Sequence, residues 1–153
     1  MYWIKPFVSF RGRVNRARFW LVSLTWMVYA AVLDYAWTAT GASEVQVGTN
    51  HYVAAVFVLV VVPPIASCLA VCVTRLHDRN KSAWWLLLFA LCPLAMETIA
   101  ALRDLDSAPV VILNILSRAI SLWALVELGC LPGTAGPNRY GPDPLAGALQ
   151  ALT

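Results

Sequence analysis

Four long apolar runs constrain the fold of this chain more than any other feature. They cover approximately residues 19–38, 52–74, 84–102 and 109–131. A helix needs about 20 mostly apolar residues to cross the hydrocarbon core of a bilayer, and each run is about that long. Hydrophobic residues make up 60% of the chain and charged residues only 12%, which excludes an ordinary soluble domain. The sequence therefore predicts an all-α integral membrane protein, a bundle of four transmembrane helices.

A short basic and aromatic segment precedes the first run. Residues 1–18 contain Trp3, Phe7 and Phe10 together with five lysines and arginines. This composition predicts an interfacial segment, with rings at headgroup depth and arginines among the phosphates. After the fourth run, residues 132–144 are rich in proline and glycine, which indicates turns. We expect residues 1–153 to form one membrane domain with a tail at residues 132–153.

The basic residues are distributed unevenly between the two sides of the predicted bundle. Five lie in residues 1–18, three lie between the second and third runs, and Arg139 lies in the tail. The two loops on the other side contain only Arg103. Because lysine and arginine are enriched in cytoplasmic loops, we expect both termini and the loop between the second and third runs to be cytoplasmic.

Ionisable residues occur inside the predicted spans. They are Asp34, Glu97, Arg118 and Glu127. Each costs about 2.5–3.5 kcal/mol at the bilayer centre, so each should face the bundle and find a partner. From their depths, we expect Arg118 to reach Glu97 or Asp34, and Glu127 to meet Arg75 or Arg79. The alternative is a proton or cation path in a small transporter or channel subunit.

The stretch from Arg75 to Trp85 is a crowded polar hinge between two apolar runs. His77 beside Asp78 is compatible with acid–base chemistry, since a carboxylate can hold an imidazole. No nucleophile has the surroundings of a catalytic triad, and no spacing indicates a metal site. We therefore expect a basic membrane anchor, with no catalytic residue, no metal and no cofactor.

The hinge can form one cytoplasmic polar cluster with the N-terminal segment and the tail. Its candidate binding residues are Arg13, Arg16, Arg75, His77, Asp78, Arg79, Asn138, Arg139 and Asp143. We expect Arg139 and Asp143 to meet Asp78 and Arg75 or Arg79. The excess of positive charge favours an anionic partner, such as lipid headgroups, a phosphorylated metabolite or an acidic protein.

Three motifs resemble those of a known family. They are Phe10-Arg11-Gly12-Arg13 with Arg16, Phe19 and Trp20; Arg75-Leu76-His77-Asp78 with Ser82, Trp84 and Trp85; and Pro132-Gly133-Thr134 with Gly136, Asn138-Arg139-Tyr140-Gly141 and Pro142-Asp143-Pro144. In this order they resemble the domain of unknown function eight-hundred-and-five family, small bacterial inner-membrane proteins with about four spanning helices. The resemblance implies this fold, a location in the inner (plasma) membrane and a functional cytoplasmic face, but no biochemical activity.

The sequence favours a non-enzymatic accessory or scaffold protein. We expect its cytoplasmic polar cluster to bind anionic lipid or a membrane-protein partner, with self-association as a further possibility, and we expect no nucleic-acid partner. Two alternatives stay open. One is the small transporter or channel subunit, and the other is an enzyme that acts on a lipid or phosphorylated headgroup.

Overall fold

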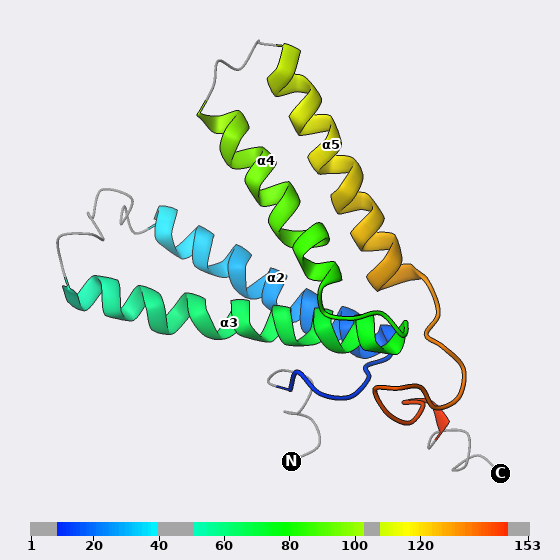
Figure 1. The fold of residues 1–153 in the computed structure, drawn as a ribbon. Coiled ribbons are helices and arrows are strands. Elements are labelled where there is room, and N and C mark those ends of the chain that lie inside the picture. Colours follow the sequence, from blue (N-terminus) through cyan, green and yellow to red (C-terminus); the bar gives the residue numbers. More distant parts are fainter. Residues whose placement is uncertain (1–8, 40–50, 103–107, 147–153) are drawn as a thin grey trace.

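The computed structural model describes residues 9–39, 51–102 and 108–146, and these residues are mostly helical (Figure 1). Residues 1–8, 40–50, 103–107 and 147–153 lie outside the described residues. They include Trp3 and Phe7 of the expected interfacial segment, both loops expected outside the cell, and the end of the tail.

Four helices occupy the positions of the four apolar runs. They are α2 (Arg16–Ala39), α3 (His51–Asp78), α4 (Cys92–Ala101) preceded by a π-helical turn η2 (Leu87–Leu91), and α5 (Ala108–Leu125) continued by a second π-helical turn η3 (Val126–Cys130). Among the described residues, three helical stretches are long and apolar enough to cross a membrane, namely Arg16–Ala39, Val58–Asp78 and Ala108–Cys130. The apolar helix Leu87–Ala101 is shorter. The predicted four-helix, all-α architecture is confirmed.

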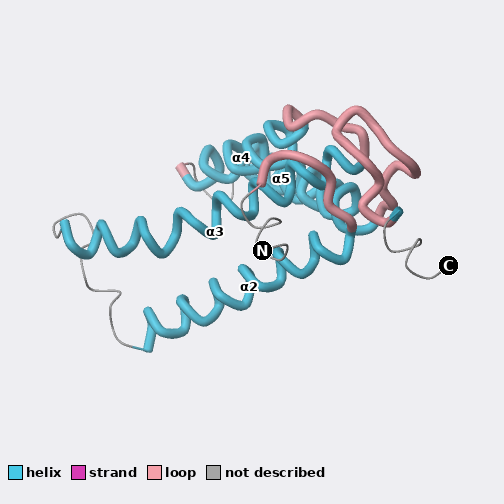
Figure 2. Tube along the Cα trace, turned by 90° about the horizontal axis from the view of Figure 1, so that it is seen from below, coloured by secondary structure: helices cyan, strands magenta, loops and turns pink. Residues whose placement is uncertain are grey.

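The helices pack as two hairpins, α2 with α3 and α4 with α5. The hairpins meet at one end and diverge toward the other (Figure 1). In the view turned by 90°, the described loops gather at the end where the hairpins meet (Figure 2). The buried apolar cluster lies at the same end and consists of Val14, Phe19, Val22, Val71, Leu76, Phe89 and Leu128. The outer surfaces of the helices carry many exposed large apolar residues, which is how a membrane-facing bundle differs from a water-soluble one.

Helix α3 extends four residues beyond the apolar run, so the polar hinge is shorter than predicted. The helix ends at Asp78, and Asn80 adopts a left-handed conformation with φ of 57°. The N–H of Lys81 donates to the carbonyl of Leu76 at 2.8 Å, and the N–H of Asn80 donates to that of His77 at 3.0 Å. These two bonds form a Schellman motif, in which asparagine is an accepted substitute for glycine. Residues 75–78 are therefore held on a helix and not in a loop.

Prolines inside the helices are accommodated without ending them. Pro63 and Pro64 lie within the continuous helix α3, where each removes a backbone donor. Pro64 leaves the carbonyl of Val60 without its usual partner, and the hydroxyl of Tyr29 on α2 donates to that carbonyl at 3.2 Å. Pro93 directly follows the π-helical turn η2 in a helix that continues to Ala101. At Pro64, a neighbouring helix thus replaces the donor that proline removes, as is common in membrane helices.

Candidate functional site

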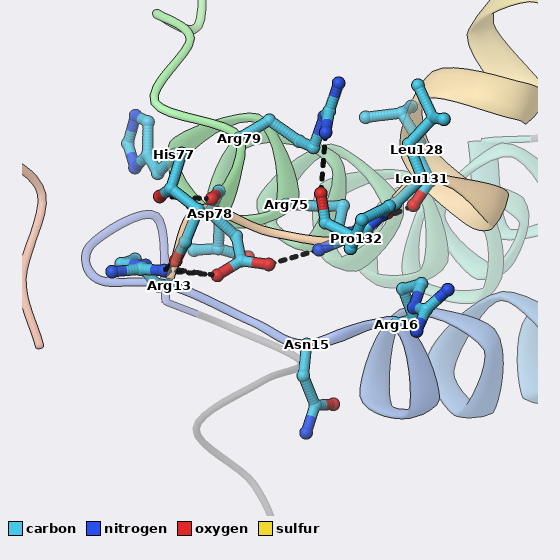
Figure 3. A network of polar contacts seen from close by, with 12 residues as sticks. Arg13, Asn15, Arg16, Arg75, His77, Asp78, Arg79, Leu128, Leu131 and Pro132 are labelled. Carbon is cyan, nitrogen blue, oxygen red and sulfur yellow. Dashed lines mark hydrogen bonds and ion pairs between the residues drawn. The ribbon is translucent and has the colours of Figure 1, made fainter. Parts of the chain in front are cut away.

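Three segments that are distant in the sequence meet where the two hairpins join. They are residues 11–18 at the start of α2, residues 75–81 at the end of α3, and residues 127–143 after α5. We call this assembly the polar cap. Figure 3 shows its centre, where side chains from α3 point toward the segments before α2 and after α5. The structure thus brings together the three pieces that carried the sequence motifs.

The carboxylate of Asp78 lies at the centre of the polar cap, between two arginines (Figure 3). Its Oδ1 accepts a hydrogen bond from Nε of Arg13 at 3.1 Å, and its Oδ2 pairs with Arg75, three residues earlier on α3. The side chains of Arg13, Arg75 and Asp78 are 1%, 0% and 4% exposed. Buried charges require partners, and this ion triad joins the segment before α2 to α3. We had expected Arg13 to lie among lipid phosphates. The structure instead pairs it with Asp78 inside the protein.

Both arginines of the triad also bind backbone carbonyls of the segment after α5. Arg13 donates to the carbonyls of Thr134, Gly136 and Gly141. Arg75 donates to those of Leu128, at 2.7 Å, and Leu131. A planar guanidinium group has five donors in a fixed arrangement, which suits it to joining irregular chain to a helix. The two arginines consequently hold residues 128–141 against the end of α3.

The backbone of Asp78 is bound as closely as its carboxylate. Its carbonyl accepts hydrogen bonds from the N–H of Thr134 at 2.8 Å and from the Thr134 hydroxyl at 3.0 Å. A Cβ atom placed on Gly133 would overlap the Asp78 carboxylate. Glycine at this position is therefore a packing requirement, and we had not singled out either Gly133 or Thr134 as a site residue.

His77 and Asp78 are not partners in the structure. The His77 ring stacks on Tyr140 with centroids 3.9 Å apart and an interplanar angle of 7°, and its Nδ1 lies 3.3 Å from the carbonyl oxygen of Gly12. The Asn138 side chain donates to the His77 carbonyl at 2.9 Å. The carboxylate of Asp78 faces arginines instead of the imidazole, so the acid–base pair considered from the sequence does not form. No group of three His, Cys, Asp or Glu side chains comes together in the described parts of the chain.

Glu127 forms a second ion cluster at the edge of the polar cap. Its Oε1 lies 3.0 Å from Nε of Arg79 and 2.8 Å from Nζ of Lys81. The expected pairing of Glu127 with Arg79 is observed, whereas its ion pair with Lys81 was not predicted. Lys81 also lies over the ring of Trp85, 4.4 Å from its centroid. This cluster links η3 to the hinge, and through Trp85 to the start of the second hairpin.

The tail residues Arg139 and Asp143 do not join the central triad, contrary to the prediction. Arg139 donates to the carbonyl of Asn80 at 3.0 Å. Asp143 accepts from the backbone N–H of Leu145 at 2.9 Å and of Gly136 at 3.1 Å, and these bonds hold the pKa of its carboxyl below the ordinary value. Asp143 thus stabilises a local turn. We had expected both aspartates to lie among the arginines of the polar cap, but Asp78 alone belongs to the central triad.

Arg16 lies at the exposed border of the polar cap. One guanidinium nitrogen donates to the carbonyl of Cys130 at 2.9 Å, and the residue is exposed. An open cavity of about 410 Å³ lies beside it, with Asn15, Asp78 and Leu145 among its lining residues. The Asn15 side chain caps α2 by accepting from the N–H of Arg18 at 3.0 Å. The border therefore combines a helix N-terminus, the exposed Arg16 and an open cavity.

The charges inside the helices do not pair with one another as expected. Asp34, Glu97 and Arg118 are exposed, and the ion pairs among described residues include none of them. Glu97 instead accepts a hydrogen bond from the Ser117 hydroxyl at 3.0 Å. Depth alone did not predict their partners, because it says nothing of the direction in which each side chain points around its helix.

Comparison with known proteins identifies the family. A family described as "Protein of unknown function (DUF805)" matches residues 7–142. The chain belongs to this family. It is 29% identical over 141 residues to inner membrane protein YhaH of Escherichia coli strain K12, with 92% of this chain and 91% of YhaH covered. Inner membrane protein YhaI of the same strain is 26% identical over 145 residues, with 95% of this chain and 93% of YhaI covered. The uncharacterized protein YiiR is 32% identical over 136 residues, with 88% of this chain and 85% of YiiR covered.

The comparison confirms the family that the three motifs had indicated, and with it a helical inner-membrane protein of unknown function. No solved structure shows a significant match. The matched residues 7–142 include the first two segments of the polar cap and all of the third except Asp143.

Proposed function

We propose that this protein is a non-enzymatic accessory protein of the inner membrane whose polar cap lies on the cytoplasmic side and binds anionic lipid headgroups. The proposal rests on a difference in exposure among the arginines of the polar cap. Arg13 and Arg75 are buried and paired with Asp78 within the chain, whereas Arg11, Arg16 and Arg18 are exposed. The exposed arginines lie within eight residues of one another, where α2 begins.

The distribution of charge supports a cytoplasmic polar cap. Eight of the eleven lysines and arginines of the chain lie in residues 11–18, 75–81 and 139. Lysine and arginine beside a spanning helix are enriched on the cytoplasmic side, where the leaflet contains anionic lipids. Fusing a reporter that is active only in the cytoplasm to the C-terminus tests this orientation, and an inactive fusion in cells that contain the full-length protein would reverse it.

The geometry of the polar cap also supports a binding role over a catalytic one. The residues that suggested acid–base chemistry, His77 and Asp78, contact a tyrosine ring and two arginines. Their hydrogen-bonding groups stabilise the join between three segments. At the border, the cavity beside Arg16 is open and large enough for a headgroup.

Lipid selectivity tests the proposal directly. The full-length protein is reconstituted in nanodiscs of a zwitterionic lipid with and without an anionic lipid, and lipid bound per protein is measured after transfer to mild detergent. Each basic residue near a membrane surface contributes about 1 kcal/mol. Changing both Arg16→Gln and Arg18→Gln should therefore weaken anionic-lipid binding by roughly thirtyfold.

The matched control is the pair Arg16→Lys and Arg18→Lys, which keeps both charges and should retain most of the binding. Binding by the native protein should also fall with added salt, because exposed charges are screened. Equal binding by the native and glutamine variants would refute the lipid proposal. If the native protein instead retains a second membrane protein that the glutamine variant loses, the exposed arginines serve a protein partner.

A further inference from the structure

Arg118 is a charged side chain at the middle of a helix that is long and apolar enough to cross a membrane. It lies ten residues after Ala108 and twelve before Cys130, the ends of that stretch. It is exposed, and no ion pair among described residues includes it. An arginine at this depth is costly to leave in hydrocarbon and is expected to pair with another group.

Arg118 lies in a row of polar residues on the surface of α5, beside the exposed apolar residues Ile115 and Leu122. Asn114 and Ser121 lie one helical turn before and after it, at spacings of four and three residues that place all three on one side of the helix. Ser121 is exposed and Asn114 is partly exposed. Three polar side chains in a row on the surface of a membrane helix are typical of an interface between helices, since hydroxyl and amide groups there hydrogen-bond across it.

A carboxylate of opposite charge is available at the same depth on the neighbouring helix. Glu97 on α4 is exposed, and its Oε1 is 3.0 Å from the hydroxyl of Ser117. Since Ser117 directly precedes Arg118 on α5, the carboxylate lies level with the arginine. The two charges belong to one hairpin, in which α4 and α5 run side by side (Figure 1), but Ser117 is buried against the hairpin whereas Arg118 is exposed.

We propose that two copies of this chain associate through their α4–α5 hairpins, with Arg118 of each copy paired to Glu97 of the other. A twofold interface makes every contact twice, so two residues of opposite charge at one depth on one hairpin satisfy each other completely. The pair is removed from lipid on both copies at once. The occupant is a second copy because the complementary carboxylate is exposed at the same depth on the same hairpin, and this dimer does not depend on the lipid proposal for the polar cap.

Charge reversal in two differently tagged copies tests this arrangement. A copy with Glu97→Lys paired with itself places two positive charges at both contacts, and a copy with Arg118→Glu paired with itself places two negative charges there. Co-expression of the two variants restores opposite charges at both contacts. We expect each variant to capture the other at least tenfold more than it captures itself.

Capture of the mixed pair that does not exceed self-capture would overturn the proposal. If Glu97 and Arg118 pair within one chain, the result differs. The chain that carries both Glu97→Lys and Arg118→Glu would then recover its self-capture, whereas co-expression of the two single variants would recover none. Asp34→Lys co-expressed with Arg118→Glu is the matched control. If that combination is captured in place of the Glu97→Lys combination, the partner carboxylate is Asp34 and the assignment of Glu97 is wrong.

Neutral variants provide a second measurement that avoids reversed charges in the membrane. The dimer fraction in mild detergent is measured for Glu97→Gln, for Arg118→Gln and for both changes together. If the residues pair across the interface, the double variant loses no more dimer than either single variant, since the contact is already lost. Losses that multiply in the double variant, or a native chain that is monomeric, would contradict the pairing.

Discussion

Replacing Asp78 with asparagine is the change to which the polar cap should respond most strongly. The carboxylate lies between Arg13 and Arg75, and the three side chains are at most 4% exposed. Asparagine has nearly the same volume, so packing is preserved while the negative charge is removed. Two buried guanidinium groups then remain without a counter-ion.

The expected loss can be estimated from the contacts that break and those that remain. Removing one partner of a buried ion pair costs about 3–5 kcal/mol, and here one carboxylate serves two arginines. The loss should not double, because five backbone carbonyls still accept from these arginines. We therefore expect Asp78→Asn to lower the free energy of unfolding by about 3–5 kcal/mol, a hundredfold to several thousandfold change in the folded-to-unfolded ratio.

Unfolding in mixed micelles with increasing denaturing detergent, followed by tryptophan fluorescence, measures this loss. Trp20 reports on the polar cap, because its Nε1 donates to the carbonyl of Gly129 at 3.1 Å. Asp143→Asn is the matched control, since Asp143 accepts from two backbone N–H groups and forms no ion pair among the described residues. Adding Arg13→Gln to Asp78→Asn should recover part of the stability, because one uncompensated charge is removed. A free energy of unfolding for Asp78→Asn within about 1 kcal/mol of native would show that the carbonyls alone compensate the arginines.

Three further changes test other contacts by the same unfolding measurement. Gly133→Ala places a Cβ atom against the Asp78 carboxylate and should cost about 3 kcal/mol or more, as breaking the triad does; a native-like value would mean that the tail moves aside. Tyr29→Phe leaves the carbonyl of Val60 without its donor and should cost about 0.6–1.7 kcal/mol, the range for hydrogen bonds between membrane helices. Glu127→Gln removes both ion pairs of its cluster and should cost about 1.5–3 kcal/mol, the range for hydrogen bonds to charged groups. An unchanged free energy of unfolding would show that this cluster contributes little to stability.

The number and positions of the helices were predictable because a bilayer imposes a length on every apolar run. The end of α3 was not predicted in the same way, since hydropathy falls at Thr74 while the helix continues to Asp78. The relevant signal was Asn80, which tolerates the left-handed conformation that ends a helix. A helix end is set by its capping residue, and in this chain the capping residue lies six residues beyond the apolar run.

The polar cap was predictable as a meeting of three segments, but its pairings were not. Arg75 and Asp78 are three residues apart, a spacing at which side chains on a helix can meet, and they do pair. The partnership of Arg13 with Asp78 joins residues 65 positions apart, and no local pattern predicts it. We had also expected Asp143 to meet Arg75 or Arg79. That prediction was wrong, because the Asp143 carboxylate accepts from backbone N–H groups two and seven residues away in its own turn.

The intramembrane charges show a different limit of sequence reasoning. Counting residues along the helices correctly places Glu97 and Arg118 near one depth, since the Glu97 carboxylate contacts Ser117. Their directions around the helices depend on which side of each helix faces its neighbour, and the apolar residues around most of each helix do not distinguish a side that faces another helix from one that faces lipid. The outcome separates the charges of this chain into two kinds. Those of the polar cap's central triad and of Glu127 are satisfied within one chain, where they join the two hairpins. Arg118 is exposed and belongs to no ion pair among the described residues, and because Glu97 lies at the same depth on the same hairpin, a second copy is the partner that we propose for it.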